Sequence, residues 1–192
     1  MKKGTKSIWV LIAAALVLCL AAATTAFLTR QVVTDNILTF GNLKIALHQT
    51  TLTADDSEVP VSQDTPFDVT SHSTVSRILR VENVGEHPLY VRVAVKMNGA
   101  TAEGEAFDAD GMVSYRLNED DWLYEDGWYY YKQPLAPHET TKELMTQVIF
   151  DDISDITQNY PGSRFELKLD AQAVQSENNA QDVLSAAGWP EQ

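Results

Sequence analysis

The sequence of 192 residues contains one cysteine. Cys19 lies inside an apolar run near the N-terminus, and it follows Leu18 rather than the small residue that a lipoprotein signal requires. If this run is a leader that is removed, the remaining chain has no cysteine and cannot form a disulfide. Such a domain must be stabilised by its hydrophobic core alone, and a chain of this length can bury enough apolar surface to fold.

Basic residues are also scarce. The chain has 14 Lys and Arg against 27 Asp and Glu, a net charge of −13 at pH 7. Three of the lysines stand in the first seven residues, so removal of a leader would bring the net charge to about −16. This balance excludes nucleic acid and an anionic membrane surface as partners, because both require basic surface. The acidity is typical of a solvated, soluble surface.

The N-terminus has the three parts of a secretion signal. Met1–Ser7 is basic, Ile8–Ala23 is a run of 16 apolar residues, and small residues lead to Ala26. We therefore expect a signal peptide over residues 1–26, cut between Ala26 and Phe27, and a secreted domain over 27–192. An uncleaved membrane anchor is the alternative, since a run from Ile8 to Leu28 is long enough to span a bilayer.

The dominant pattern after residue 40 is alternation of apolar and polar residues. It runs through Leu43–His48, Leu89–Met97 and Phe165–Ala173. Further strands are predicted at Val75–Val84, Met112–Leu117, Trp128–Lys132 and Leu144–Phe150, with a weaker one at Phe67–Thr70. Turn-rich links without helices between them predict an all-β, antiparallel β-sandwich. The pattern leaves jelly-roll and immunoglobulin-like topologies open.

One helix is expected, at the C-terminus. Within Ser176–Trp189, four residues share one side of a helix, and Gly188 followed by Pro190 ends it. These four are Ala180, Val183, Leu184 and Ala187. We expect this short helix to cap the sandwich.

Residues typical of catalytic and metal sites are missing. The histidines are His48, His72, His87 and His138, and none belongs to a helical pair with an adjacent glutamate. No Gly-x-Ser-x-Gly elbow is present. The sequence therefore predicts no enzyme, no catalytic residue, no metal and no cofactor; a zinc site assembled from distant positions is the alternative.

Acidic residues cluster in several turns. Asp108 and Asp110 before Gly111 are slightly similar to a calcium loop, but the further ligands and the closing glutamate are absent. Solvated acidic turns are the preferred interpretation, and weak calcium binding stays open.

Aromatic residues gather in "DDWLYEDGWYYYK", residues 120–132. In a strand, Trp128 and Tyr130 would face one way and Tyr129 and Tyr131 the other, so that one pair fills a core and the other packs across strands. An aromatic surface for stacking on sugars is the alternative. Its members would be Trp122, Trp128, Tyr129 and Tyr131.

Three passages together resemble one known family. They are "TDNILTFGNLKIAL" after the Ala26–Phe27 site, "VENVGEHPLYVRVAV" and "DGWYYYKQPLAPHETT". In this order they resemble the TasA/camelysin family of exported bacterial proteins, whose signal peptide is removed by a SipW-like signal peptidase. One departure is that Gly41 directly follows Phe40, one residue closer than in the commonest form.

The resemblance implies a secreted, jelly-roll-like β-sandwich of the cell surface or biofilm matrix. An exported protein without cysteine also suits a Gram-positive bacterium. Some members form fibres by donating an N-terminal strand to the next subunit. We therefore hypothesise a donor strand within residues 27–40, anchored by Val32, Val33, Ile37 and Leu38. Pairing of this segment within its own sandwich is the alternative.

The sequence thus favours a secreted structural protein that associates with itself and meets a membrane only through an uncleaved signal. The alternatives are a monomeric glycan-binding module of the cell surface and a camelysin-like metallopeptidase. For the peptidase the sequence offers no zinc motif.

Overall fold

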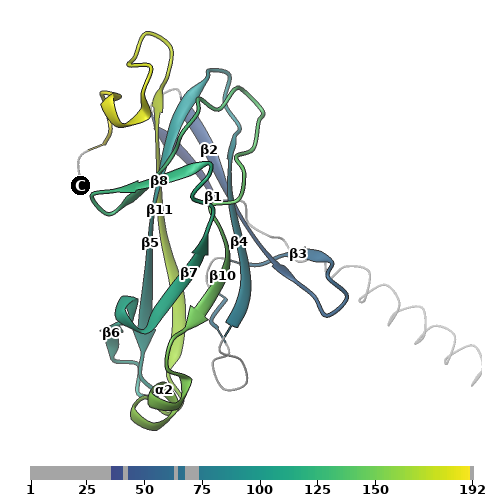
Figure 1. Ribbon diagram of the computed structural model, residues 1–192, viewed down its shortest axis with the longest axis vertical. Helices are drawn as coiled ribbons and strands as arrows, with labels where there is room; N and C mark the ends of the chain where they lie inside the picture. Colours follow the sequence, from purple (N-terminus) through teal and green to yellow (C-terminus); the bar gives the residue numbers. More distant parts are fainter. Residues whose placement is uncertain (1–35, 41–42, 63–64, 68–73, 191–192) are drawn as a thin grey trace, which may run out of the picture. The chain divides into compact units, whose positions relative to one another are not determined.

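The computed structural model describes residues 36–40, 43–62, 65–67 and 74–190. Figure 1 shows long strands with the short helix α2 (Ile153–Asn159) at one end. The strands of the first half are β1 (Asn36–Phe40), β2 (Leu43–Leu52), β3 (Glu58–Pro60), β4 (Thr74–Asn83), β5 (Leu89–Ala100) and β6 (Ala106–Asp108). Those of the second half are β7 (Val113–Leu117), β8 (Trp122–Glu125), β9 (Trp128–Tyr131), β10 (Met145–Phe150) and β11 (Arg164–Gln175). The helical elements are η1 (Asp110–Met112), α2 (Ile153–Asn159) and η2 (Val183–Ser185).

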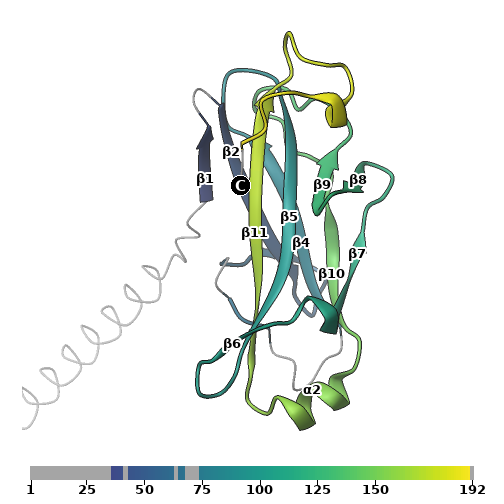
Figure 2. The same cartoon turned by 90° about the vertical axis from the view of Figure 1, so that its left-hand side faces the viewer.

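The described strands form two antiparallel sheets. Sheet A has the order β1-β2-β4-β10-β7, with β3 also pairing with β2. Sheet B has the order β11-β5-β9-β8, with β6 also pairing with β5. Figure 2 shows β11 and β5 of sheet B in front of β2 and β4 of sheet A. The predicted antiparallel β-sandwich is confirmed.

The main core fills the space between the two sheets. It takes the inward residues of the alternating strands, such as Leu79 and Val81 of β4 and Val91 and Val93 of β5, which are completely buried. Phe150 of β10 packs edge-on against Phe165 of β11, with ring centroids 5.4 Å apart. Burial of this apolar surface is the main source of stability for a sandwich without disulfides.

The β4–β5 turn is fixed by the side chain of Asn83. Its amide nitrogen donates hydrogen bonds to the carbonyl oxygens of His87 (2.9 Å) and Leu135 (3.0 Å). Its amide oxygen accepts one from the Gly85 N–H (3.0 Å). All hydrogen-bonding atoms of this completely buried side chain are therefore engaged, as burial of a polar group requires.

Strand β8 was not predicted as a separate element. The residues between β8 and β9 are Asp126 and Gly127, and both have positive φ, 49° and 85°. This is the type I′ geometry that Asp-Gly favours in two-residue hairpins. The dipeptide could have revealed the hairpin from the sequence.

The helical content differs from the prediction. The helix expected at Ser176–Trp189 is reduced to the single turn η2, because polar side chains bind the local backbone instead. Asn179 accepts hydrogen bonds from the N–H groups of Ala180 and Ala187, both at 2.9 Å. The helix α2 was missed; Asp152 caps it by accepting from the Asp155 N–H at 2.9 Å.

Several predictions fall outside the described residues: the cleavage site Ala26–Phe27, the anchors Val32 and Val33, and His72. Of the weak strand at Phe67–Thr70, only Phe67 is described, and it forms an isolated bridge with Phe165. None of the helices in the described ranges has the length and apolar character needed to cross a bilayer.

Candidate functional site

The first candidate site is the edge of the sandwich formed by β1. This strand pairs with β2 over five residues, from Asn36–Leu47 to Phe40–Leu43, and it is the outermost strand of sheet A. Leu38 is half-buried against the main core. The predicted donor anchors Ile37 and Leu38 therefore pair within their own sheet.

Strand β11 is the edge of sheet B on the same side, and it contacts β1. Its twelve residues pair with β5 in unbroken register. The Phe165 carbonyl accepts from the Phe67 N–H (2.9 Å), so Phe165 directs its backbone away from β5. By alternation, Leu167, Leu169 and Ala171 direct theirs the same way. Each sheet thus presents one strand at this side with backbone groups able to pair.

The alternative of an aromatic surface is wrong for its two tryptophans, and the preferred interpretation of packed aromatic residues fits them. Trp122 is 2% exposed and Trp128 is 4% exposed, while Tyr129 and Tyr131 are half-buried at the border of the main core. Trp128 lies on the outer face of sheet B, where residues of the C-terminal segment cover it. We call this set the outer cluster: Tyr90, Trp128, Tyr130, Val174, Val183, Ala186 and the adjoining Trp189.

Arg92 organises the outer cluster. Its guanidinium lies 4.2 Å from the ring centroid of Trp128 and 4.7 Å from that of Trp189. It donates to Gln172 Oε1 at 2.9 and 2.6 Å and to the Pro190 carbonyl at 3.2 Å. Tyr90 also holds the segment, since its hydroxyl donates to the Ala180 carbonyl at 3.0 Å. Sequence reasoning missed Arg92, because nothing local to it indicates a partner about a hundred residues away.

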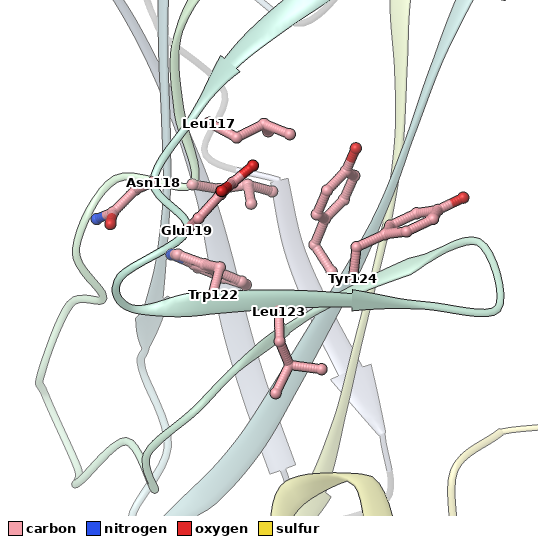
Figure 3. Close-up of a pocket in the computed structure, with 8 residues that line it drawn as sticks. Leu117, Asn118, Glu119, Trp122, Leu123 and Tyr124 are labelled. Carbon is pink, nitrogen blue, oxygen red and sulfur yellow. The ribbon is translucent and has the colours of Figure 1, made fainter.

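A second candidate site is an aromatic pocket on the other face of the β8–β9 hairpin. It is a cavity of about 200 Å³. Its walls are Leu117, Asn118, Glu119, Trp122, Leu123, Tyr124, Tyr129 and Leu144. Figure 3 shows Trp122 and Tyr124 on one side of β8 and Leu123 on the other.

Tyr124 is an exposed aromatic member of the pocket, with 63% of its surface accessible, and its ring lies 4.8 Å from that of Tyr129 at 46°. Burial raises the pKa of the Tyr129 hydroxyl, and the nearby Tyr124 and Asp110 add to this rise. Trp122 closes the inner end, with its indole N–H donating to the Lys142 carbonyl at 3.2 Å. Tyr124 and Glu119 were not singled out from the sequence.

Arg77 and Tyr115 lie outside both candidate sites, and burial shifts the pKa of each. Arg77 is 4% exposed; its guanidinium lies 4.4 Å from the centroid of Phe67 and donates to the Thr65 carbonyl at 3.4 Å. Burial lowers its pKa to about 10. The Tyr115 hydroxyl is buried without a hydrogen-bond partner in the described structure, and burial raises its pKa.

The histidines and acidic turns do not converge in the described part of the chain. No group of three or more His, Cys, Asp or Glu there could hold a metal ion. His48 binds Glu82 at 2.7 Å. Asp110, part of the loop weighed for calcium, accepts a hydrogen bond from the Met97 backbone N–H.

Comparison with known proteins gives no relative for this chain. No protein-family model matches it. No curated protein matches it either. Among solved structures, the CBM3a-L domain, with flanking linkers, from the scaffoldin cipA of the cellulosome of Clostridium thermocellum has 12% identity over 81% of this chain and 84% of that chain. The TM-score of 0.15 is too low for this likeness to support an argument.

Proposed function

We propose that this protein is a secreted structural subunit of the cell surface or extracellular matrix, which associates with copies of itself by exchanging its first strand. The observation that supports this most is the position of β1. It is short, it lies at the edge of sheet A, and in the described ranges its backbone pairing is with β2. The same strand from another copy can therefore form the same ladder without disturbing an inner strand.

The neighbouring edge strand β11 supports the continuation of such an exchange along a fibre. An arriving segment that pairs with β2 lies beside β11, whose outward backbone groups pair with no strand in the described ranges apart from the bridge to Phe67. Residues before Asn36 supply the length for this, and they include the predicted anchors Val32 and Val33. A shared strand that leaves its own sandwich joins one subunit to the next.

A disulfide that locks β1 to its own β2 tests the exchange. Thr39 and Lys44 are partners in the ladder, and Lys44 directs its carbonyl to Val84, away from β1. They therefore form the close, non-hydrogen-bonded kind of pair, whose Cα atoms lie about 4.5 Å apart, a separation that a disulfide can bridge. The variant is Thr39→Cys with Lys44→Cys, made in the exported protein.

The readout is assembly against concentration, by light scattering and electron microscopy. We expect the oxidised variant to stay monomeric, and the reduced variant and the wild type to assemble alike. Lys44→Cys alone is the matched control for disulfides between molecules. Equal assembly of the oxidised and reduced variants, or a wild type that stays monomeric at every concentration, would refute strand exchange.

A further inference from the structure

The aromatic pocket contains one carboxylate among apolar and aromatic walls. The carboxylate of Glu119 forms no hydrogen bond or ion pair within the described ranges. The rings of Tyr124 and Tyr129 and the side chains of Leu117 and Leu144 complete the walls. Such a site suits a ligand with an apolar stem and a positive end.

The size of the cavity limits what it can hold. Its volume is about 200 Å³. Pockets for drug-sized ligands measure about 300–1,000 Å³. The pocket therefore suits one side chain better than an oligosaccharide.

The local charge favours a cation. Residues 118–127 contain five carboxylates and no Lys or Arg. The nearest downstream base is Lys132, and its ammonium is already engaged with the carbonyl oxygens of Glu119 and Asp120, both at 2.8 Å. A negative field of this kind raises the local concentration of positively charged groups.

The outer cluster is an example, within this protein, of aromatic rings that hold a cation. In the outer cluster, Arg92 places its positive charge over Trp128 and Trp189. In the described part of the chain, no Lys or Arg lies over Tyr124 or Tyr129. Rings of Tyr attract a cation placed over their faces in the same way.

The backbone beside the pocket favours an extended peptide over a free amine. The Trp122 N–H donates to the Asn118 carbonyl at 3.1 Å, so this residue directs its backbone away from β9. Alternation gives the N–H and C=O of Tyr124 the same direction. Strand β8 is the edge of sheet B, and a peptide lying along it can pair with Tyr124.

We propose that the pocket binds a lysine side chain of an extended basic peptide from a partner protein. The peptide pairs with Tyr124 of β8, its lysine stem lies against Trp122 and Leu117, and the ammonium meets Glu119 and the tyrosine rings. This site lies on strands other than β1, so the proposal does not depend on strand exchange.

The probe is a capped ten-residue peptide of alternating threonine and valine with one central lysine. Its control carries acetyl-lysine, which keeps the stem and removes the charge. Binding to the exported protein is measured by calorimetry, and contact with the pocket by the NMR shifts of the Trp122 indole and the Tyr124 ring. We expect the lysine peptide to bind, to shift both signals, and to bind at least about fivefold more tightly than the acetylated peptide.

Two exposed residues provide the variants. Glu119→Gln and Tyr124→Leu are each expected to weaken binding about twofold to fivefold, and the double variant about tenfold. Glu103→Gln, in the β5–β6 loop, removes the same charge away from the pocket and is expected to change Kd by less than about twofold at physiological salt.

Four outcomes would overturn the proposal. They are equal binding of the two peptides, equal effects of Glu119→Gln and Glu103→Gln, binding of butylamine as tightly as the peptide, and binding of cellohexaose that Tyr124→Leu abolishes. The third would indicate a site for free amines, and the fourth a site for glycans.

Discussion

The aromatic residues on the two faces of the β8–β9 hairpin differ in their burial and in the charged group beside them. On one side Trp128 and Tyr130 are buried under the C-terminal segment, with Arg92 over the rings. On the other side Tyr124 is exposed beside a carboxylate. An aromatic-rich strand alone therefore does not indicate a binding surface. The two faces differ because the C-terminal segment covers one of them and Arg92 places a cation over its rings.

Truncating one aromatic residue on each side should give the largest contrast. Trp128→Ala removes a buried indole from the outer cluster and should lower the free energy of unfolding by about 3–5 kcal/mol. Tyr124→Ala removes an exposed ring that contacts Tyr129 and should cost less than about 1 kcal/mol. Urea denaturation of both variants measures the difference; equal losses would show that the C-terminal segment does not bury Trp128.

Replacing Arg92, the cation of the outer cluster, should give the next largest loss of stability. Arg92→Met keeps an apolar stem over Trp128 but removes the hydrogen bonds to Gln172 and Pro190. Because hydrogen bonds of charged groups are the stronger kind, we expect a loss of about 2–3 kcal/mol. Limited proteolysis should also cut the C-terminal segment faster in this variant. Unchanged stability and unchanged cutting would contradict a fastening role for Arg92.

Replacing Arg77 should raise the free energy of unfolding, whereas replacing Arg92 should lower it. It is a buried cation whose only polar partner in the described structure is the Thr65 carbonyl. Burial lowers its folded pKa to about 10, below its ordinary value, so burial of the charged form opposes folding. Arg77→Met should raise the unfolding free energy by about 1–2 kcal/mol at pH 7. A loss of stability comparable to that of Arg92→Met would show that Arg77 has a partner of matching strength.

The smallest effect at neutral pH is expected at Tyr115. Its hydroxyl is buried without a partner in the described structure, so Tyr115→Phe removes no hydrogen bond and should not lower stability by more than about 0.5 kcal/mol at pH 7. Above pH 10 the difference grows. The unfolded chain ionises near the ordinary pKa of 10.0, whereas burial keeps the folded phenol protonated to higher pH. Wild-type stability therefore falls as pH rises past 10.

Tyr115→Phe should remove part of this alkaline loss. Unfolding measured at pH 8 and at pH 11 gives the comparison, with Tyr129→Phe as a second variant of the same expected sign. Parallel curves for the wild type and Tyr115→Phe would show that Tyr115 ionises equally in the folded and unfolded chains.

Alternation in the sequence was sufficient to predict the sandwich, because each long strand has one apolar face. The alternation in the sequence identified the inward residues of β5 and β11. The burial of Trp128 could not, since it depends on the C-terminal segment, whose irregular path is set by bonds such as those of Asn179. The pocket could not be predicted from the sequence either. Glu119 follows β7 of sheet A and Tyr129 lies in β9 of sheet B, so their common place in the pocket depends on how the two sheets are arranged.

The Asn83 side chain has a consequence for the order in which the molecule takes shape. One of its acceptors, Leu135, lies 52 residues further along the chain. A polypeptide that is synthesised from its N-terminus presents Asn83 before this carbonyl exists. The bonds of Asn83 within the turn, to His87 and from Gly85, can form early, but its amide is fully engaged only after residue 135 has been added.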